Sequence, residues 1–261
     1  MGIEILHDRC LSCECCVSAC RRYIFRMGGK GKIEIDQNLL PLCMHCGHCT
    51  AVCPGEAIVL DGVPSASLPE LPANLGLSPD ALMLFLKSKR SVGAYSSREV
   101  PREVLEKALD AANYAPSARG AHPVRWVVIT EPANRERLLQ EMLPYYEHAE
   151  DVTSRSHYEN YLKGVDSLLR YAPCIVLACA PEHVYGEADC VSAATYLSLA
   201  LYAQGVASCW AGSILALTRQ GSLKSVAVPE GCEAYAALMV GYPDENFLKL
   251  PHRPDPVVTF M

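Results

Sequence analysis

Two copies of one cysteine pattern lie near the start of this 261-residue chain and limit what it can fold into. In each copy the spacing is C-x2-C-x2-C-x3-C, and the second copy follows the first with a constant offset of 33 residues. The cysteines are Cys10, Cys13, Cys16, Cys20, Cys43, Cys46, Cys49 and Cys53. A constant offset indicates an internal duplication. Short β-type runs at 3–6, 33–35 and 57–60 predict two similar halves with small strands and short helices.

This spacing is typical of cubane iron-sulfur sites, in which three close thiolates bind one cluster and the fourth binds the other. On that pattern the first [4Fe-4S] cluster takes Cys10, Cys13, Cys16 and Cys53, and the second takes Cys43, Cys46, Cys49 and Cys20. The alternative is two structural zinc sites, which also use C-x2-C pairs. Zinc sites usually separate two pairs by a long loop, so the spacing favours iron.

Six of the fourteen cysteines stay outside this assignment. Cys15 lies between two predicted ligands, and the others are Cys174, Cys179, Cys190, Cys209 and Cys232. We expect those five to be small buried side chains. Residues 1–10 lack a basic segment followed by an apolar one, which predicts no signal peptide and a reducing, cytoplasmic location. A disulfide scaffold is therefore not expected.

Charge and hydropathy exclude two classes of partner. The chain has 23 basic and 29 acidic residues, a net charge of -6, which argues against nucleic acid or an anionic membrane as the main partner. No charged residue occurs from Cys190 to Thr218, but the uninterrupted helical part, about 188–203, is too short to cross a bilayer. We interpret it as a buried helix of a soluble protein.

Composition divides the chain into a cysteine-rich domain at 1–61, a proline-rich linker at 62–78 and a larger domain at 79–261. In the larger domain, helices are predicted to begin at Ser78-Pro79 and at Val100-Pro101. Strands are predicted at 126–129, 174–180 and 234–240. This alternation predicts an α/β or α+β fold with helices packed on a sheet.

Two family resemblances follow from these motifs. Residues 1 to about 60 resemble a bacterial ferredoxin of the two-[4Fe-4S] type. Residues 79–261 resemble the nitroreductase-like FMN flavoproteins in four stretches that keep the family's order, at 89–92, 112–123, 205–213 and 241–253. The resemblance implies a ferredoxin-like module joined to an α+β sandwich with helices around a central sheet. No G-x-G-x-x-G turn follows a predicted strand, so a Rossmann nicotinamide domain is not evident.

The resemblance also implies how FMN is held. Its phosphate lies at the basic end of a helix, and the last cations of the chain complete that site. An A-P-S loop lies at the flavin, and backbone N–H groups at 212 and 213 face the flavin N5 edge. The implied cofactor-binding residues are Lys89, Arg90, Ser91, Gly93, Pro116, Ser117, Ala118, Gly120, His122, Ala211, Gly212, Ser213, Lys249 and Arg253. The chain departs from the family at Gly93, where Arg or Lys is usual, and at Gly120 and His122, where Asn and Gln are usual.

Together the two halves imply an electron relay. A cubane cluster passes one electron, whereas a flavin accepts single electrons and delivers a hydride pair. The predicted function is an oxidoreductase in which an external low-potential donor reduces the clusters and FMN reduces a small electrophile such as a nitroaromatic, quinone, enone or halogenated compound. The alternative is an electron-transfer or redox-sensing module with no dedicated substrate. An oxygen-consuming flavin enzyme is less favoured because exposed clusters are oxygen-labile.

Two further expectations concern the surroundings of the flavin. Residues 134–171 are predicted to cover the flavin face with aromatic side chains, or to use those side chains to pack their own helices. These side chains are Tyr145, Tyr146, His148, His157, Tyr158 and Tyr161. No catalytic acid or base is assigned. The resemblance implies a homodimer with the flavin at the subunit interface.

Overall fold

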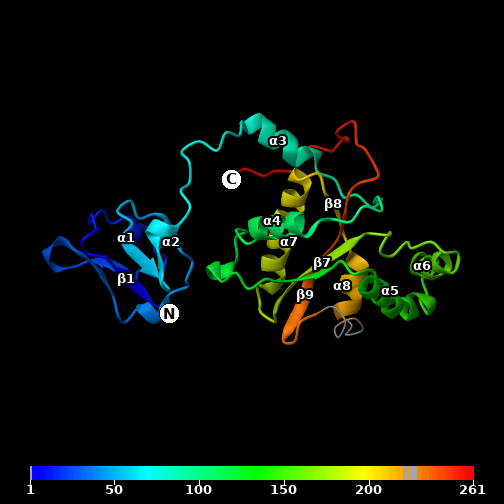
Figure 1. Cartoon of the computed structure of the whole chain (residues 1–261), viewed down its shortest axis with the longest axis horizontal. Helices are drawn as coiled ribbons and strands as arrows, with labels where there is room; N and C mark the ends of the chain where they lie inside the picture. The colour runs from blue at the N-terminus through cyan, green and yellow to red at the C-terminus, as the bar shows by residue number, and fades with distance from the viewer. Residues whose placement is uncertain (1, 220–222, 224–227) are drawn as a thin grey trace. The chain divides into compact units, whose positions relative to one another are not determined.

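A computed structural model describes residues 2–219, 223 and 228–261 (Figure 1). By their contacts these residues form two compact units, Met1–Gly76 with Ala118–Ala121, and Leu77–Ser117 with His122–Met261. We call the first the cysteine-rich unit and the second the larger unit. The predicted linker at 62–78 begins with ordered structure, because Val63–Pro64 pairs with a strand and the Ser65 hydroxyl donates to the Ile58 carbonyl at 2.7 Å.

The cysteine-rich unit contains two small antiparallel sheets. β1 (Ile3–Ile5) pairs with β4 (Ile58–Leu60), which pairs with β5 (Val63–Pro64). β2 (Phe25–Met27) pairs with β3 (Ile33–Ile35). The sequence predicts β1, β3 and β4 but misses β2, a three-residue strand with a charged residue at its centre. The unit's short helices are α1 (Cys15–Ala19) and α2 (His48–Ala51).

The 33-residue repeat in the sequence is also a repeat of backbone conformation. Three pairs of residues that lie 33 apart all have positive φ, between 51° and 73°: Ser12 and His45, Glu14 and Gly47, Tyr23 and Glu56. The helices α1 and α2 begin 33 residues apart as well. A positive φ costs a residue other than glycine about 1–3 kcal/mol, so it persists only where the surroundings require it. The duplication therefore conserves a strained loop around each set of cysteines.

The larger unit has one four-stranded antiparallel sheet. Its order is β6 (Arg125–Ile129), β7 (Cys174–Pro181), β9 (Cys232–Gly241) and β8 (Ala207–Trp210). The sequence predicts β6, β7 and β9, but β8 is too short to stand out from the loop that precedes it. In β7, Ile175 and Leu177 face one side of the sheet, and Val176 and Ala178 face the other.

Helices cover both faces of this sheet (Figure 1). One face packs against α5 (Pro132–Glu147), α6 (Val152–Leu162) and α8 (Gly212–Arg219). The other packs against α4 (Arg102–Ala112) and α7 (Gly186–Ala203). This is the predicted α+β sandwich of helices around a central sheet. It brings the end of α7 and the strand β8 together at one edge of the unit.

Two helices leave apolar side chains exposed, and one of them, at 188–203, is predicted from the sequence to be buried. No side chain of α3 (Pro79–Ser88) is buried, although Ser78 caps its start by accepting the N–H of Ala81 at 3.1 Å. The helix α7 buries one face in the core but leaves Val191 37% and Tyr196 43% exposed. Among the described residues, no helix combines the length and the apolar character that crossing a bilayer requires.

Candidate cofactor sites

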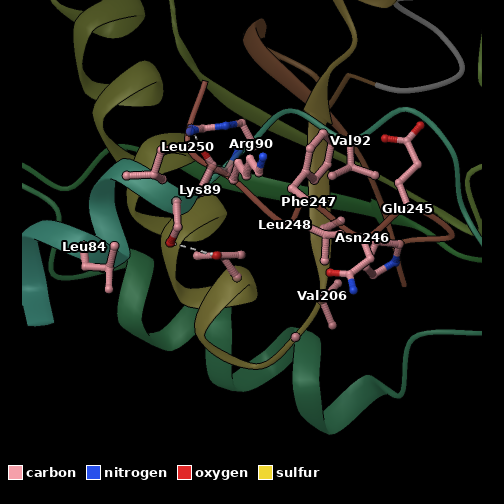
Figure 2. A pocket seen from close by; sticks show the side chains of 16 residues that line it. Leu84, Lys89, Arg90, Val92, Val206, Glu245, Asn246, Phe247, Leu248 and Leu250 are labelled. Carbon is pink, nitrogen blue, oxygen red and sulfur yellow. Dashed lines mark hydrogen bonds between the residues drawn. The ribbon is translucent and has the colours of Figure 1, made fainter. Parts of the chain in front are cut away.

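A cavity of about 450 Å³ lies between the ends of α3 and α7 and residues 243–250 (Figure 2). Lys89, Arg90 and Lys249 line it, among mostly apolar side chains and one carboxylate, Glu245. The structure thus brings together cations that lie about 160 positions apart in the chain. These three are among the residues predicted to hold a phosphate.

Local contacts hold this cavity in shape. The Tyr202 hydroxyl, on α7, donates to Ser88 Oγ at 2.9 Å, which holds the end of α3 next to Lys89. The Val92 N–H donates to the Ser208 carbonyl of β8 at 3.2 Å. The Asp244 N–H donates to the Ala94 carbonyl at 3.1 Å, so the segment that carries Lys249 returns past the first basic segment.

The cations in this cavity have no carboxylate partner among the residues that the structure describes. Within the described residues, neither Lys89 nor Arg90 takes part in an ion pair. Arg90 Nη1 donates instead to the Lys89 carbonyl at 2.6 Å. Lys89 is half-buried, and this burial lowers the pKa of its ammonium group. A partly desolvated, unpaired ammonium group favours binding of an anion, and a phosphate matches the neighbouring guanidinium as well.

Two predicted residues near this cavity do not line it. Ser91 is exposed and forms an isolated parallel bridge with Ser208. Gly93 lies against the side chain of Arg170, whose guanidinium occupies the space that a Cβ atom on Gly93 would need. Position 93 thus lacks the basic side chain usual in the resembling family but has another cation beside it. The sequence offers no signal for this contact, because 77 residues separate the two positions.

The last predicted cation, Arg253, is also outside the cavity. It lies in the exposed segment after residue 250, and its Nη1 donates to the neighbouring His252 carbonyl at 3.2 Å. The structure therefore places one of the two C-terminal cations, Lys249, with Lys89 and Arg90.

The A-P-S loop lines a separate, very small cavity with Pro116, Ser117 and His122. Ser117 Oγ accepts the His122 N–H at 2.9 Å, which closes the loop on itself. The indole nitrogen of Trp126, on the same cavity, is buried and has no hydrogen-bond partner among the described residues. Ala118 and Gly120 fall in the short segment that groups with the cysteine-rich unit.

The junction between β8 and α8 holds the remaining predicted flavin contacts. Ala211 is buried, and its N–H donates to the Ala237 carbonyl of β9 at 2.9 Å. Gly212 begins α8, where the first N–H groups of a helix have no partner within it. A Cβ atom on Gly212 would meet nothing within 4 Å, so the space beside this backbone is open. The Ser213 side chain hydrogen-bonds to Tyr146, whose pKa is raised mainly by burial.

The aromatic side chains of α5 and α6 mostly pack these helices together. Tyr146 is buried, and its ring meets His157 edge to face with centroids 5.4 Å apart. Tyr158 and Tyr161 pack against the core on the same face of the sheet. Of the two expectations for this region, helix packing accounts for these side chains.

The predicted cysteine ligands line two separate cavities in the cysteine-rich unit. The first is lined by Cys10, Cys13, Cys16 and Cys53, with the additional Cys15. The second is lined by Cys20, Cys43, Cys46 and Cys49. In each cavity, the last cysteine of one motif lies with the first three of the other. All fourteen cysteines are free thiols.

Both cavities contain a buried thiol and a sulfur atom that accepts a backbone hydrogen bond. Cys16 and Cys49 are each only 8% exposed, and burial raises their pKa values to about 11 and about 12. The Ala57 N–H donates to Cys53 Sγ at 3.3 Å, and the His45 N–H donates to Cys43 Sγ at 3.4 Å. Within the described ranges, no three His, Cys, Asp or Glu side chains are arranged as a metal site. The thiols are thus gathered in two sets but are not arranged around a single metal ion.

Comparison with known proteins identifies the larger unit. The family model "Nitroreductase family" matches residues 86–242, more than half of the chain. The chain belongs to the nitroreductase family. The match contains the first basic segment, the A-P-S loop and Gly212, while residues 1–85 lie outside it. We therefore call the larger unit the nitroreductase unit.

Individual relatives agree with this assignment. A Methanothermobacter thermautotrophicus protein, provisionally named an NADH dehydrogenase/NAD(P)H nitroreductase, is 27% identical over 62% of this chain and 76% of its own length. A nitroreductase with bound FMN from Bacteroides fragilis has a TM-score of 0.61 and 22% identity, covering 69% of this chain and 98% of that chain. Another with bound FMN, from Desulfitobacterium hafniense, has a TM-score of 0.56 and 22% identity, covering 66% and 93%. The solved structures share the fold of the nitroreductase unit.

Proposed function

We propose that this protein is an FMN-dependent oxidoreductase that receives electrons through two [4Fe-4S] clusters and reduces a small electrophilic acceptor. The observation that carries the FMN part is Lys89, a half-buried ammonium group in one cavity with Arg90 and Lys249. No described carboxylate pairs with it. These cations would hold the FMN phosphate. The open space beside Gly212 supports a flavin edge there, since a glycine permits close approach of the backbone.

The cluster part rests on the cysteine-rich unit. Its eight motif cysteines divide into the two crossed sets that two cubane clusters require. Positive φ values recur on both sides of Cys13 and of Cys46. Turns of this kind direct successive N–H groups into a concavity that favours anions, including iron-sulfur clusters. Two strained loops with the same 33-residue offset support two equivalent anionic groups.

The proposed reaction balances with two single-electron steps at the protein's input. Bound clusters would supply one-electron transfer, and bound FMN would supply two-electron chemistry. Two molecules of an external low-potential donor are each oxidised by one electron. The acceptor gains these two electrons and two protons, as a hydride and a proton, and the protons come from solvent. Lys89, Arg90 and Lys249 bind and orient in this scheme, and no side chain is assigned as an acid or base.

We also propose that the protein is a homodimer with FMN at the subunit interface. Apolar side chains that the described chain leaves uncovered support this proposal. On α3, Leu82, Met83 and Leu86 are 38–49% exposed, and Val191 and Tyr196 lie exposed on α7. Light scattering at several protein concentrations tests it, and a monomer throughout would contradict it.

Anaerobic purification with iron, sulfide, zinc and flavin analysis tests the central proposal. Two four-iron sites predict about eight irons and one FMN per chain. Cys13→Ser should lower the iron content, whereas Cys15→Ser should not, although both cysteines line the same cavity. Protein reduced with dithionite should then be reoxidised by a nitroaromatic, quinone, enone or halogenated acceptor.

Three results would contradict parts of this proposal. Finding zinc and no flavin would refute both proposed cofactors, the iron-sulfur clusters and FMN. Fewer than four irons per chain would refute the two clusters. Full cofactor content without reoxidation by any of these acceptors would favour an electron-transfer module without a dedicated substrate.

A further inference from the structure

The two cysteine cavities differ in the charges that line them. Three arginines line the second cavity, together with Cys20, Cys43, Cys46 and Cys49: they are Arg21, Arg22 and, from the short segment 118–121 that groups with this unit, Arg119. Glu14 lines the first cavity, together with Cys10, Cys13, Cys16 and Cys53. No carboxylate lines the second cavity among the described residues, and no Lys or Arg lines the first. The repeat therefore duplicates the thiols but not their electrostatic surroundings.

In the part of the chain that the structure describes, no ion pair neutralises the charges of Arg21, Arg22 and Glu14. Glu14 lies at the start of α1 but its side chain makes no capping hydrogen bond there. Arg22 is half-buried and Arg21 is exposed. Among the described residues, the positive charges of Arg21, Arg22 and Arg119 thus lie beside one set of thiols and the negative charge of Glu14 lies beside the other.

Other factors that set a cluster potential are closely matched between the cavities. In each cavity a backbone N–H donates to a ligand sulfur, at 3.3 Å to Cys53 and at 3.4 Å to Cys43. The buried thiols Cys16 and Cys49 are equally exposed. Cys13 is more exposed than Cys46, which favours reduction at the first cavity because water stabilises added negative charge. The charges act in the opposite direction, since Arg21, Arg22 and Arg119 line the second cavity and Glu14 lines the first.

We propose that the cluster held by Cys20, Cys43, Cys46 and Cys49 has the higher reduction potential, because Arg21 and Arg22 stabilise its reduced form. A thiolate-ligated cluster becomes more negative when it gains an electron, so adjacent cations raise its potential and an adjacent carboxylate lowers it. When an external donor is oxidised by one electron, that electron then reduces this second cluster. The inference depends on the proposed clusters and adds the order in which the two clusters are reduced.

A potentiometric titration of the anaerobic holoprotein, followed by electron paramagnetic resonance, tests this order. Cys13→Ser and Cys46→Ser occupy equivalent positions in the repeat and assign each signal to its site. As the potential is lowered, the signal altered by Cys46→Ser should appear first. In Arg21→Gln/Arg22→Gln, the ratio of reduced to oxidised second cluster should fall at least tenfold at a fixed potential, which is about 59 mV for one electron.

Two further variants separate charge from folding. Arg21→Lys/Arg22→Lys keeps both charges and should keep the order of reduction. Arg26→Gln removes an exposed arginine of β2 that lines neither cavity and should change neither potential.

Each failure has a distinct signature. First reduction at the site altered by Cys13→Ser, or unchanged potentials in Arg21→Gln/Arg22→Gln, would overturn the inference and leave the proposed function intact. Fewer than four irons per chain would instead refute the clusters and with them the inference.

Discussion

The hydroxyl groups of Ser198 and Ser208 hydrogen-bond to each other at 2.8 Å inside the nitroreductase unit, where both side chains are buried. Ser198 lies on α7 and Ser208 on β8. The Ser208 carbonyl accepts the Val92 N–H at 3.2 Å, and Val92 lies two residues after Arg90. This buried pair therefore connects the core of the unit to the segment that carries the candidate phosphate site.

Ser198→Ala leaves the Ser208 hydroxyl buried without its partner, which should lower the free energy of unfolding by about 1–3 kcal/mol. Ser198→Ala/Ser208→Ala removes both hydroxyl groups, so its loss should be smaller than the sum of the single losses. Urea unfolding followed by tryptophan fluorescence reports on this unit, because Trp126 and Trp210 both lie in it. Additive losses would mean that the two hydroxyl groups do not depend on each other.

Lys89→Gln should weaken FMN binding by about 10–100-fold, because it removes a charge-assisted hydrogen bond worth about 1.5–3 kcal/mol. Lys87→Gln is the matched control, since Lys87 is exposed on α3 and does not line the cavity. Riboflavin, which lacks the phosphate, should bind the wild type and Lys89→Gln equally. Flavin fluorescence quenching measures all these affinities. An equal loss for riboflavin and FMN would place the phosphate elsewhere.

Because of Lys89, a rise in pH should increase the stability of the folded protein and decrease its affinity for FMN. Burial lowers its pKa in the folded state, so the unfolded chain binds the proton more tightly. The contribution of Lys89 to stability therefore rises as pH rises through the folded-state pKa toward the ordinary value of about 10.4. FMN affinity should fall over the same range because the phosphate needs the ammonium form.

Lys89→Met tests this pH dependence. At neutral pH it should raise the melting temperature of the FMN-free protein, because it removes a partly buried charge that no described carboxylate neutralises. It should also abolish the alkaline loss of FMN affinity. Melting curves and FMN titrations from about pH 7 to 10 measure both effects. A lower melting temperature for FMN-free Lys89→Met would show that the ammonium group stabilises the fold.

Gly212→Ala and Gly241→Ala should distinguish a space that a ligand can occupy from a space that side chains already fill. A Cβ atom on Gly241 would lie 2.7 Å from the Pro173 ring and 2.8 Å from the Tyr95 ring, so overpacking should cost about 1–3 kcal/mol. A Cβ atom on Gly212 would meet nothing within 4 Å, so Gly212→Ala should fold normally and weaken FMN binding. Unfolding and FMN titrations compare the two. Unchanged FMN affinity in Gly212→Ala would exclude the flavin from this space.

Thiol alkylation should distinguish the five cysteines of the nitroreductase unit. Burial raises the pKa values of Cys174, Cys179 and Cys190 to about 12, and Cys232 is buried as well. Cys209 is the partly exposed member of the set. Iodoacetamide at about pH 8 should therefore modify Cys209 first in the folded protein, since the thiolate is the reactive form. Peptide mapping by mass spectrometry checks this, and early modification of Cys174 would contradict it.

Prediction from sequence was most successful where a pattern is local. Consecutive residues indicate the long apolar runs of β7 and β9 and the capped start of α3. The sequence does not reveal β2 and β8, because three or four residues carry too little periodicity to indicate a strand. The apolar residues of α3 have helical spacing, but spacing alone does not determine whether a neighbouring element covers them.

By itself, the sequence determined the number and spacing of the thiols, the duplication that relates them and the family of the larger unit. Only the tertiary structure decided that Lys249 joins Lys89 and Arg90 while Arg253 does not, and that Arg170 lies over Gly93. It also decided that cations surround one set of thiols and a carboxylate the other. The physical reason is the range of the interactions. Spacing along the chain dictates local geometry, whereas contacts between distant residues depend on how the strands and helices pack.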